Sequence, residues 1–104
     1  MQKIKHPLIN KADSAHYDST KTPAILDFER QYSIADLRAW AKITLAKYEH
    51  PARANKGQVA ADVRKAQTYR DYYHFLDIII KKYPPLADVT CVNAYDALGY
   101  EMEY

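Results

Sequence analysis

A run of basic and aromatic side chains between residues 42 and 70 is the part of the sequence best suited to chemistry. It holds seven lysines and arginines against two acids, Glu49 and Asp62. Lysine and arginine side chains bind phosphate oxygens, and aromatic rings stack on flat bases. These residue types therefore indicate a pocket for an anionic and aromatic ligand such as a nucleotide. A solvated helical hairpin is the alternative that the composition leaves open.

Four residues within this run are spaced for one face of a helix. Asp62, Lys65, Tyr69 and Tyr72 follow one another at steps of three, four and three residues, which places them in a single stripe. On a functional interpretation, Lys65 binds a phosphate, and Asp62 either holds Mg²⁺ or orients a base. On a structural interpretation, Asp62 and Lys65 only pair with each other on the helix surface.

A basic loop over residues 51–58 precedes that stripe and contributes Arg53 and Lys56. Because the loop leads into the N-terminus of a helix, where anions are favoured, both side chains are suited to phosphate binding. Lys47 and Tyr48 come from the last turn of the helix before the loop.

Trp40 lies seven residues before Lys47, about 10 Å along a helix axis. That separation would suit a base on the indole and a phosphate on the ammonium group of Lys47. A Trp40 in the core or at an interface, beside a solvated Lys47, fits the spacing equally well.

His16 and Tyr17 are the remaining candidates, in a segment without helical periodicity, where a surface pair is the plain alternative. The sequence has no P-loop, no paired Cys and His of a zinc site, no serine-hydrolase elbow and no paired E-x-x-E carboxylates. Any phosphate must therefore be bound by Lys and Arg side chains or by N–H groups at a helix start.

The elements that would position these residues are mostly helices. Thr22 and Ser33 are expected N-caps, Pro51 ends a helix, and Gly99 is an expected C-cap. We expect an all-α domain with a central antiparallel helical hairpin, short flanking helices and an extended N-terminal arm over residues 1–21. The expected helices cover residues 23–32, 34–50, 59–82 and 88–98.

Composition indicates one domain over residues 1–104, expected to be soluble and cytoplasmic. The start has no apolar signal region, no apolar run could span a membrane, and Cys91 is the only cysteine. Residues 86–104 form an acidic C-terminal segment, which could pack on the basic middle of the chain. A net charge of +2 makes nucleic acid an unfavoured partner. The ten tyrosines exceed what a core needs, so some should lie at a subunit interface or line a ligand site.

Taken in order, several short motifs resemble those of a family of small phage proteins. They are "HY" at 16–17, "KY" at 47–48, Arg53 and Lys56 in the loop, and "ADVRKAQTY" at 61–69. The resemblance covers residues 16 to about 76. Its short-tailed-phage representative is a nucleotide kinase without a P-loop, which phosphorylates deoxynucleoside monophosphates. The chain departs from the family pattern in a longer loop, in Gly57 where the family has a second lysine, and in Val63 where it has leucine.

The resemblance implies phosphoryl transfer from ATP or another nucleoside triphosphate, with Mg²⁺, in the cytoplasm of an infected cell. The implied phosphate ligands are Arg53, Lys56 and Lys65, with Lys47 neutralising developing charge and Asp62 helping to hold Mg²⁺. The implied nucleotide-binding residues are His16, on a phosphate or sugar hydroxyl, and Tyr17, Tyr48 and Tyr69 at the base. Because a hairpin alone buries little ligand surface, a homo-oligomer with the pocket between subunits is expected.

Several alternatives remain open. The same residues would serve a protein that sequesters a nucleotide or cyclic nucleotide without turnover. "YDSTKTP" at 17–23 resembles the N-terminal motif of phage dATP/dGTP diphosphohydrolases, although the metal ligands of such enzymes are not recognisable. Nucleic-acid binding by the basic hairpin, and a purely structural helical protein, are further possibilities.

Overall fold

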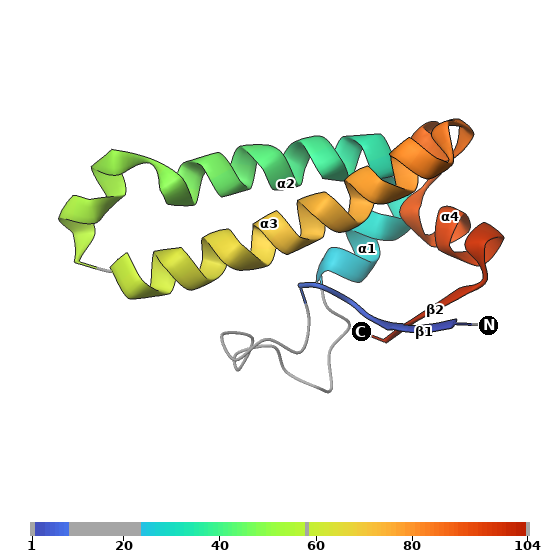
Figure 1. Ribbon diagram of the computed structural model, residues 1–104, viewed down its shortest axis with the longest axis horizontal. Helices are drawn as coiled ribbons and strands as arrows, with labels where there is room; N and C mark the ends of the chain where they lie inside the picture. The colour runs from blue at the N-terminus through green and yellow to red at the C-terminus, as the bar shows by residue number, and fades with distance from the viewer. Residues whose placement is uncertain (1, 9–23, 58, 104) are drawn as a thin grey trace.

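The structure, a computed structural model, describes residues 2–8, 24–57 and 59–103, and it is mostly helical. Figure 1 shows two long helices, α2 (Ile34–Glu49) and α3 (Val59–Lys82), lying side by side and running in opposite directions. A 3₁₀ turn, Pro51–Lys56, connects them at one end of the molecule. The short helices α1 (Ala24–Gln31) and α4 (Cys91–Leu98) lie at the other end. The prediction of a mostly helical domain is confirmed.

Local signals explain where the helices begin and end. The Ser33 hydroxyl accepts a hydrogen bond from the Asp36 N–H at 3.1 Å, which caps α2 as predicted. Gly99 ends α4 with a φ of 72°, a conformation that favours glycine, also as predicted. The predicted start of the last helix at Asp88 is wrong. Residues 84–88 form a 3₁₀ turn instead, and the Thr90 side chain caps α4, which begins at Cys91.

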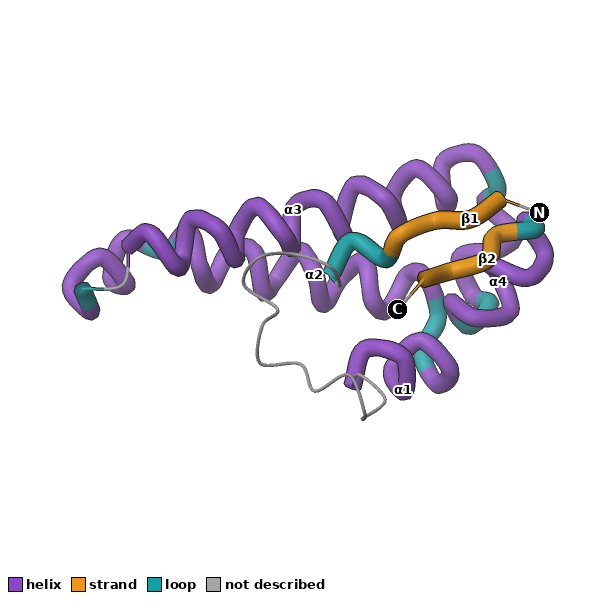
Figure 2. The backbone as a smooth tube through the Cα atoms, turned by 90° about the horizontal axis from the view of Figure 1, so that it is seen from below, coloured by secondary structure: helices purple, strands orange, loops and turns teal. Residues whose placement is uncertain are grey.

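A short parallel sheet joins the two ends of the chain, and nothing in the sequence had indicated it. β1 (Gln2–Lys5) pairs with β2 (Tyr100–Glu103), and Figure 2 shows the two strands side by side along one face of the helices. The register places Lys3 opposite Glu101 and Lys5 opposite Glu103. The acidic C-terminal segment therefore packs on the basic N-terminal strand, where opposite charges face each other, and not on the basic middle of the chain.

The core lies between the long helices and the elements at their far end. α2 and α3 form the core along their shared face, and α1, α4 and the segment after β1 close it. Its buried residues include Ile34, Leu37, Ala41, Leu76, Ile79, Cys91 and Ala94. The N-termini of α2 and α4 are tied by backbone hydrogen bonds, from Ile34 N–H to Val89 C=O and from Cys91 N–H to Tyr32 C=O, both 3.1 Å. The connecting turn and the start of α3 extend beyond this core, and there the predicted site lies.

Candidate functional site

The ring of Tyr48 is the centre of a cationic cluster at the connected end of α2 and α3. Three positive groups lie about it: the Arg53 guanidinium carbon at 5.0 Å from the ring centroid, and the Lys47 and Lys65 ammonium nitrogens at 5.5 Å each. A cation within about 6 Å of an aromatic centroid is attracted by the ring. The helix end, the loop and α3 thus place Lys47, Tyr48, Arg53 and Lys65 together, as the sequence predicted.

Arg53 is held in place by Asp62. The 3₁₀ turn brings the guanidinium back over the start of α3, where Nε donates to Oδ2 at 2.8 Å and Nη2 donates to Oδ1 at 3.1 Å. These hydrogen bonds raise the pKa of Arg53. The structure therefore gives Asp62 a partner from the loop, which the sequence analysis had not paired with it. A bidentate pair of this kind fixes the plane of the guanidinium.

Tyr69 extends the cluster toward the core. Its ring is stacked on Tyr48, with centroids 5.8 Å apart and planes inclined by 17°, and Trp40 meets it edge-on at 5.4 Å. Trp40 also packs edge-on against Tyr72 and Phe28, with centroids 6.4 and 6.3 Å away. The indole is thus part of the aromatic packing between the helices, which is the alternative reading of its spacing from Lys47.

A hollow of about 360 Å³ opens beside Tyr48, Arg53 and Asp62. It is also lined by His50 and Arg70, which sequence reasoning had not assigned to the site. His50 Nδ1 accepts from the Ala52 N–H at 3.1 Å, so the other ring nitrogen carries the proton when the imidazole is neutral. Arg70 Nη2 pairs with Glu49 at 3.2 Å across the two helices.

Three further residues of the predicted site cannot be placed relative to Tyr48. His16 and Tyr17 lie outside the described residues. Lys56 is the last residue of the connecting turn, and its side chain also lies outside what the structure describes. The signal that would have found His50 is its position directly before Pro51, where its ring nitrogen can accept a hydrogen bond from the turn that follows.

Asp62, which the sequence suggested as a residue that helps to hold Mg²⁺, is bound by Arg53. Both of its carboxylate oxygens accept hydrogen bonds from Arg53. Over residues 2–8, 24–57 and 59–103, no three or more His, Cys, Asp and Glu side chains come together as metal ligands would. Magnesium prefers oxygen ligands from carboxylates and phosphates. In this arrangement Asp62 orients Arg53.

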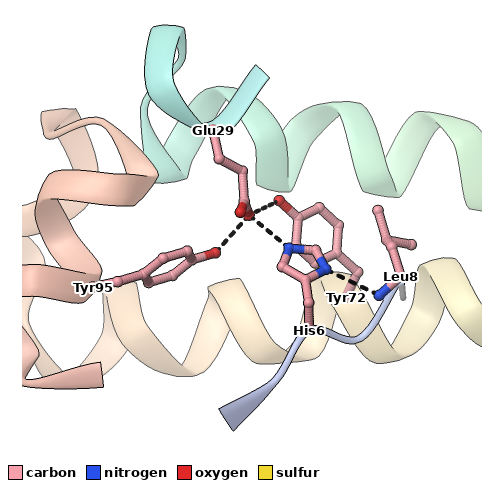
Figure 3. Close-up of polar contacts among 5 residues, drawn as sticks. All are labelled: His6, Leu8, Glu29, Tyr72 and Tyr95. Atoms are coloured by element: carbon pink, nitrogen blue, oxygen red, sulfur yellow. Dashed lines mark hydrogen bonds and ion pairs between the residues drawn. The ribbon is translucent and has the colours of Figure 1, made fainter. Parts of the chain in front are cut away.

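A second polar cluster, which sequence reasoning missed, lies inside the core (Figure 3). One carboxylate oxygen of Glu29, on α1, accepts three hydrogen bonds: from Tyr72 on α3 at 2.5 Å, from Tyr95 on α4 at 2.6 Å and from His6 after β1 at 3.0 Å. The side chains of His6 and Glu29 are both fully buried. We call these four residues the Glu29 cluster. Its burial makes it a structural joint between four elements, out of reach of a ligand.

The geometry also defines the tautomer of His6. Its Nδ1 accepts a hydrogen bond from the Leu8 N–H at 3.2 Å, so Nδ1 carries no proton there. The proton of the neutral ring is then on Nε2, which donates it to Glu29. One histidine and two phenols thus surround one buried carboxylate, and each phenol finds the partner that a buried tyrosine needs. This accounts for two of the surplus tyrosines.

The Glu29 cluster should make stability depend on pH. Burial by itself raises the pKa of Glu29, but the hydrogen bonds from His6, Tyr72 and Tyr95 outweigh it and hold the pKa below its usual value. A carboxylate with a lowered folded-state pKa stabilises the fold above its unfolded pKa of about 4.3, and this contribution is lost as the pH falls through the folded-state pKa. We expect the free energy of unfolding to fall on acidification below about pH 5.

The measurement is a series of urea unfolding curves from neutral to acid pH, for the wild type and for Glu29→Gln. The variant lacks the titrating group, so its curve should fall less steeply over the same range. The pKa of Asp77 is also lowered, by hydrogen bonds from Lys81 and Arg38. Because Asp77 is present in both proteins, it contributes equally to the pH dependence of the two curves. Parallel curves for the two proteins would contradict the prediction.

Within the described ranges, no helix is long and apolar enough to cross a membrane. Comparisons with protein-family models, with curated proteins and with solved structures find no match. The site therefore has to be interpreted from its own residues.

Proposed function

We propose that the chain binds a nucleotide at the cluster around Tyr48 and transfers a phosphoryl group from a nucleoside triphosphate to a deoxynucleoside monophosphate. The observation that carries the binding step is the convergence of Arg53, Lys47 and Lys65 on one tyrosine ring. Positive groups held beside a hollow with an aromatic wall suit a ligand that joins phosphates to a flat base.

The arrangement of Arg53 supports a phosphate ligand in particular. Two of its guanidinium nitrogens are bound to Asp62, which fixes the fork before any ligand arrives. A pre-oriented arginine loses little side-chain freedom on binding. The hollow beside it, about 360 Å³, falls within the usual range for small-molecule pockets. Arg70 and His50 on its wall add further donors for phosphate oxygens.

Phosphoryl transfer asks little covalent chemistry of a protein, which is why this simple site could support it. The bond between the γ-phosphorus and the bridging oxygen of the donor breaks, and a bond forms to a phosphate oxygen of the monophosphate. The nucleoside diphosphate leaves with the bridging oxygen. Arg53 and Lys65 would align the two phosphates and neutralise the transferred charge, and Mg²⁺ would enter as part of the triphosphate. The resemblance to the phage nucleotide kinases is what favours this reaction.

Binding without turnover is the second candidate, and the pairing of Asp62 favours it. Both carboxylate oxygens of Asp62 already bind Arg53, so Asp62 adds little to the oxygen ligands that the triphosphate supplies to Mg²⁺. A sequestering protein needs neither Mg²⁺ nor a reactive carboxylate, and it would use the same cations and rings.

The test is a thermal-shift screen with nucleoside mono-, di- and triphosphates and with cyclic nucleotides, in the presence and absence of Mg²⁺. A ligand that binds only the folded chain raises the unfolding midpoint by mass action. We expect shifts with nucleotides but not with the corresponding nucleosides, since phosphates are the groups that the cations bind. The absence of any nucleotide shift would overturn both candidates.

A second measurement separates the two candidates. Conversion of deoxynucleoside monophosphate to diphosphate, followed by chromatography with Mg²⁺ and a triphosphate donor, is expected if the chain is a kinase. A thermal shift without conversion, unchanged by leaving out Mg²⁺, would establish sequestration instead.

A further inference from the structure

One side of α2 carries a stripe of four residues, of which three are exposed and one, Trp40, is partly buried against the core. Asp36, Trp40, Ile43 and Lys47 follow one another at steps of four, three and four residues, so they share one side of the helix. Asp36 and Lys47 are exposed, and Ile43 leaves 70% of its surface to solvent, the largest fraction among the large apolar side chains described. The stripe thus has an acid at one end, a base at the other and apolar groups between them.

A hollow of about 490 Å³ lies beside the N-terminal half of this stripe. Its lining is apolar apart from one carboxylate and consists of Phe28, Tyr32, Asp36, Leu37 and Trp40. Phe28 and Tyr32 are 39% and 47% exposed, and Phe28 lies edge-on to both Tyr32 and Trp40. A single exposed apolar residue needs no explanation, but the exposed Ile43 lies three residues along the helix from Trp40, which lines an aromatic hollow.

The stripe is complementary to itself. Positions 36 and 47 are symmetric about the midpoint between residues 41 and 42, and positions 40 and 43 are symmetric about the same point. If two copies of α2 lie antiparallel across a two-fold axis through that midpoint, Asp36 of each faces Lys47 of the other. Ile43 of each then faces Trp40 and the hollow of the other. The four side chains span about 16 Å along the helix, enough for a continuous contact.

We propose that the chain forms a two-fold dimer through α2, with Ile43 of each copy seated in the aromatic hollow of the other. Such an interface is isologous and closes on itself, so it gives a dimer and not a filament. Aromatic residues such as those lining the hollow are enriched in the cores of protein interfaces, and the Asp36–Lys47 pairs at the rim would set the register.

The dimer also bears on the nucleotide site, although it does not depend on it. Lys47 would be shared between the Tyr48 ring and Asp36 of the second copy. Lys65, and Arg53 with its partner Asp62, would take no part in the interface.

The test is sedimentation velocity over a range of protein concentrations. We expect the wild type to sediment at twice the 12.0 kDa mass of the chain. Ile43→Glu should raise the dimer dissociation constant at least about 30-fold, the size of an interface hot spot. The matched control is Ile78→Glu, an isoleucine on α3 that is 54% exposed and lies off the stripe, which should leave the dimer intact.

A charge exchange tests the register. Asp36→Lys and Lys47→Glu should each weaken the dimer, because each places like charges opposite each other. The double variant Asp36→Lys/Lys47→Glu restores opposite charges at both ends, so it should recover most of the lost affinity. Circular dichroism of every variant checks that the helices remain folded. A monomeric wild type, a dimer insensitive to Ile43→Glu, or a double variant no better than the single ones would overturn the proposal.

Discussion

Replacing Glu29 by glutamine should lower the free energy of unfolding by about 3 kcal/mol. The three hydrogen bonds that the carboxylate accepts from Tyr72, Tyr95 and His6 are charge-assisted, and the amide turns each into a weaker neutral bond. A loss of about 1 kcal/mol for each bond gives the estimate. Because small domains are stable by only about 5–15 kcal/mol, this is a large fraction of the total.

The measurement is urea unfolding at neutral pH, with Glu49→Gln as the matched control. The Glu49 side chain is half exposed and pairs with Arg70 at the surface, so its replacement should cost no more than about 0.5 kcal/mol. A double-mutant cycle with Tyr72→Phe or Tyr95→Phe tests the coupling directly. Each phenylalanine should cost less in the Glu29→Gln background than in the wild type. If Glu29→Gln is no more harmful than Glu49→Gln, the cluster does not hold the fold together.

Replacing Arg53 by lysine should weaken nucleotide binding at least about tenfold, the size of one charge-assisted hydrogen bond. Lysine keeps the positive charge but cannot bind both oxygens of Asp62, so the group beside Tyr48 loses its fixed orientation. Asp62→Asn should act in the same direction, because the neutral amide holds the guanidinium less firmly. Titration calorimetry with the nucleotide that gives the largest thermal shift measures both effects.

Matched variants separate this local effect from a general loss of positive charge. Lys65→Gln removes a cation 5.5 Å from the Tyr48 centroid and should also weaken binding. Lys82→Gln removes an exposed cation from the last residue of the same helix and should leave binding unchanged. Equal losses in Lys65→Gln and Lys82→Gln would mean that net charge, and not the cluster around Tyr48, binds the ligand.

The helices could be predicted because their signals are local. Ser33 caps α2, Pro51 ends it, Gly99 ends α4 in a left-handed conformation, and each acts within a few residues of its own position. The predicted start of α4 at Asp88 was wrong because several local signals lie close together in this part of the chain. Pro84 and Pro85 follow the end of α3 and begin a 3₁₀ turn, and the side chain of Thr90 then caps α4.

The members of the Tyr48 cluster could be named from the sequence, but their pairing could not. Lys65 and Tyr69 share a helix face with Asp62, so helical spacing was enough to group them. Asp62 is also bound by Arg53, nine residues away, because the 3₁₀ turn folds back over the start of α3. The path of a turn with one glycine at its end depends on the packing of the two helices that it connects.

By itself the sequence determined the two long helices, the caps at Ser33 and Gly99 and the residues of the cationic cluster, since each depends on side chains within a turn or two of one another. Only the tertiary structure decided the Glu29 cluster, whose hydrogen bonds join residues 23, 43 and 66 positions apart, and the sheet between the two ends of the chain. A buried carboxylate is stable only where several donors converge on it, and a strand forms only where its partner lies. Both conditions are met when distant elements pack together, so no local pattern in the chain could reveal them.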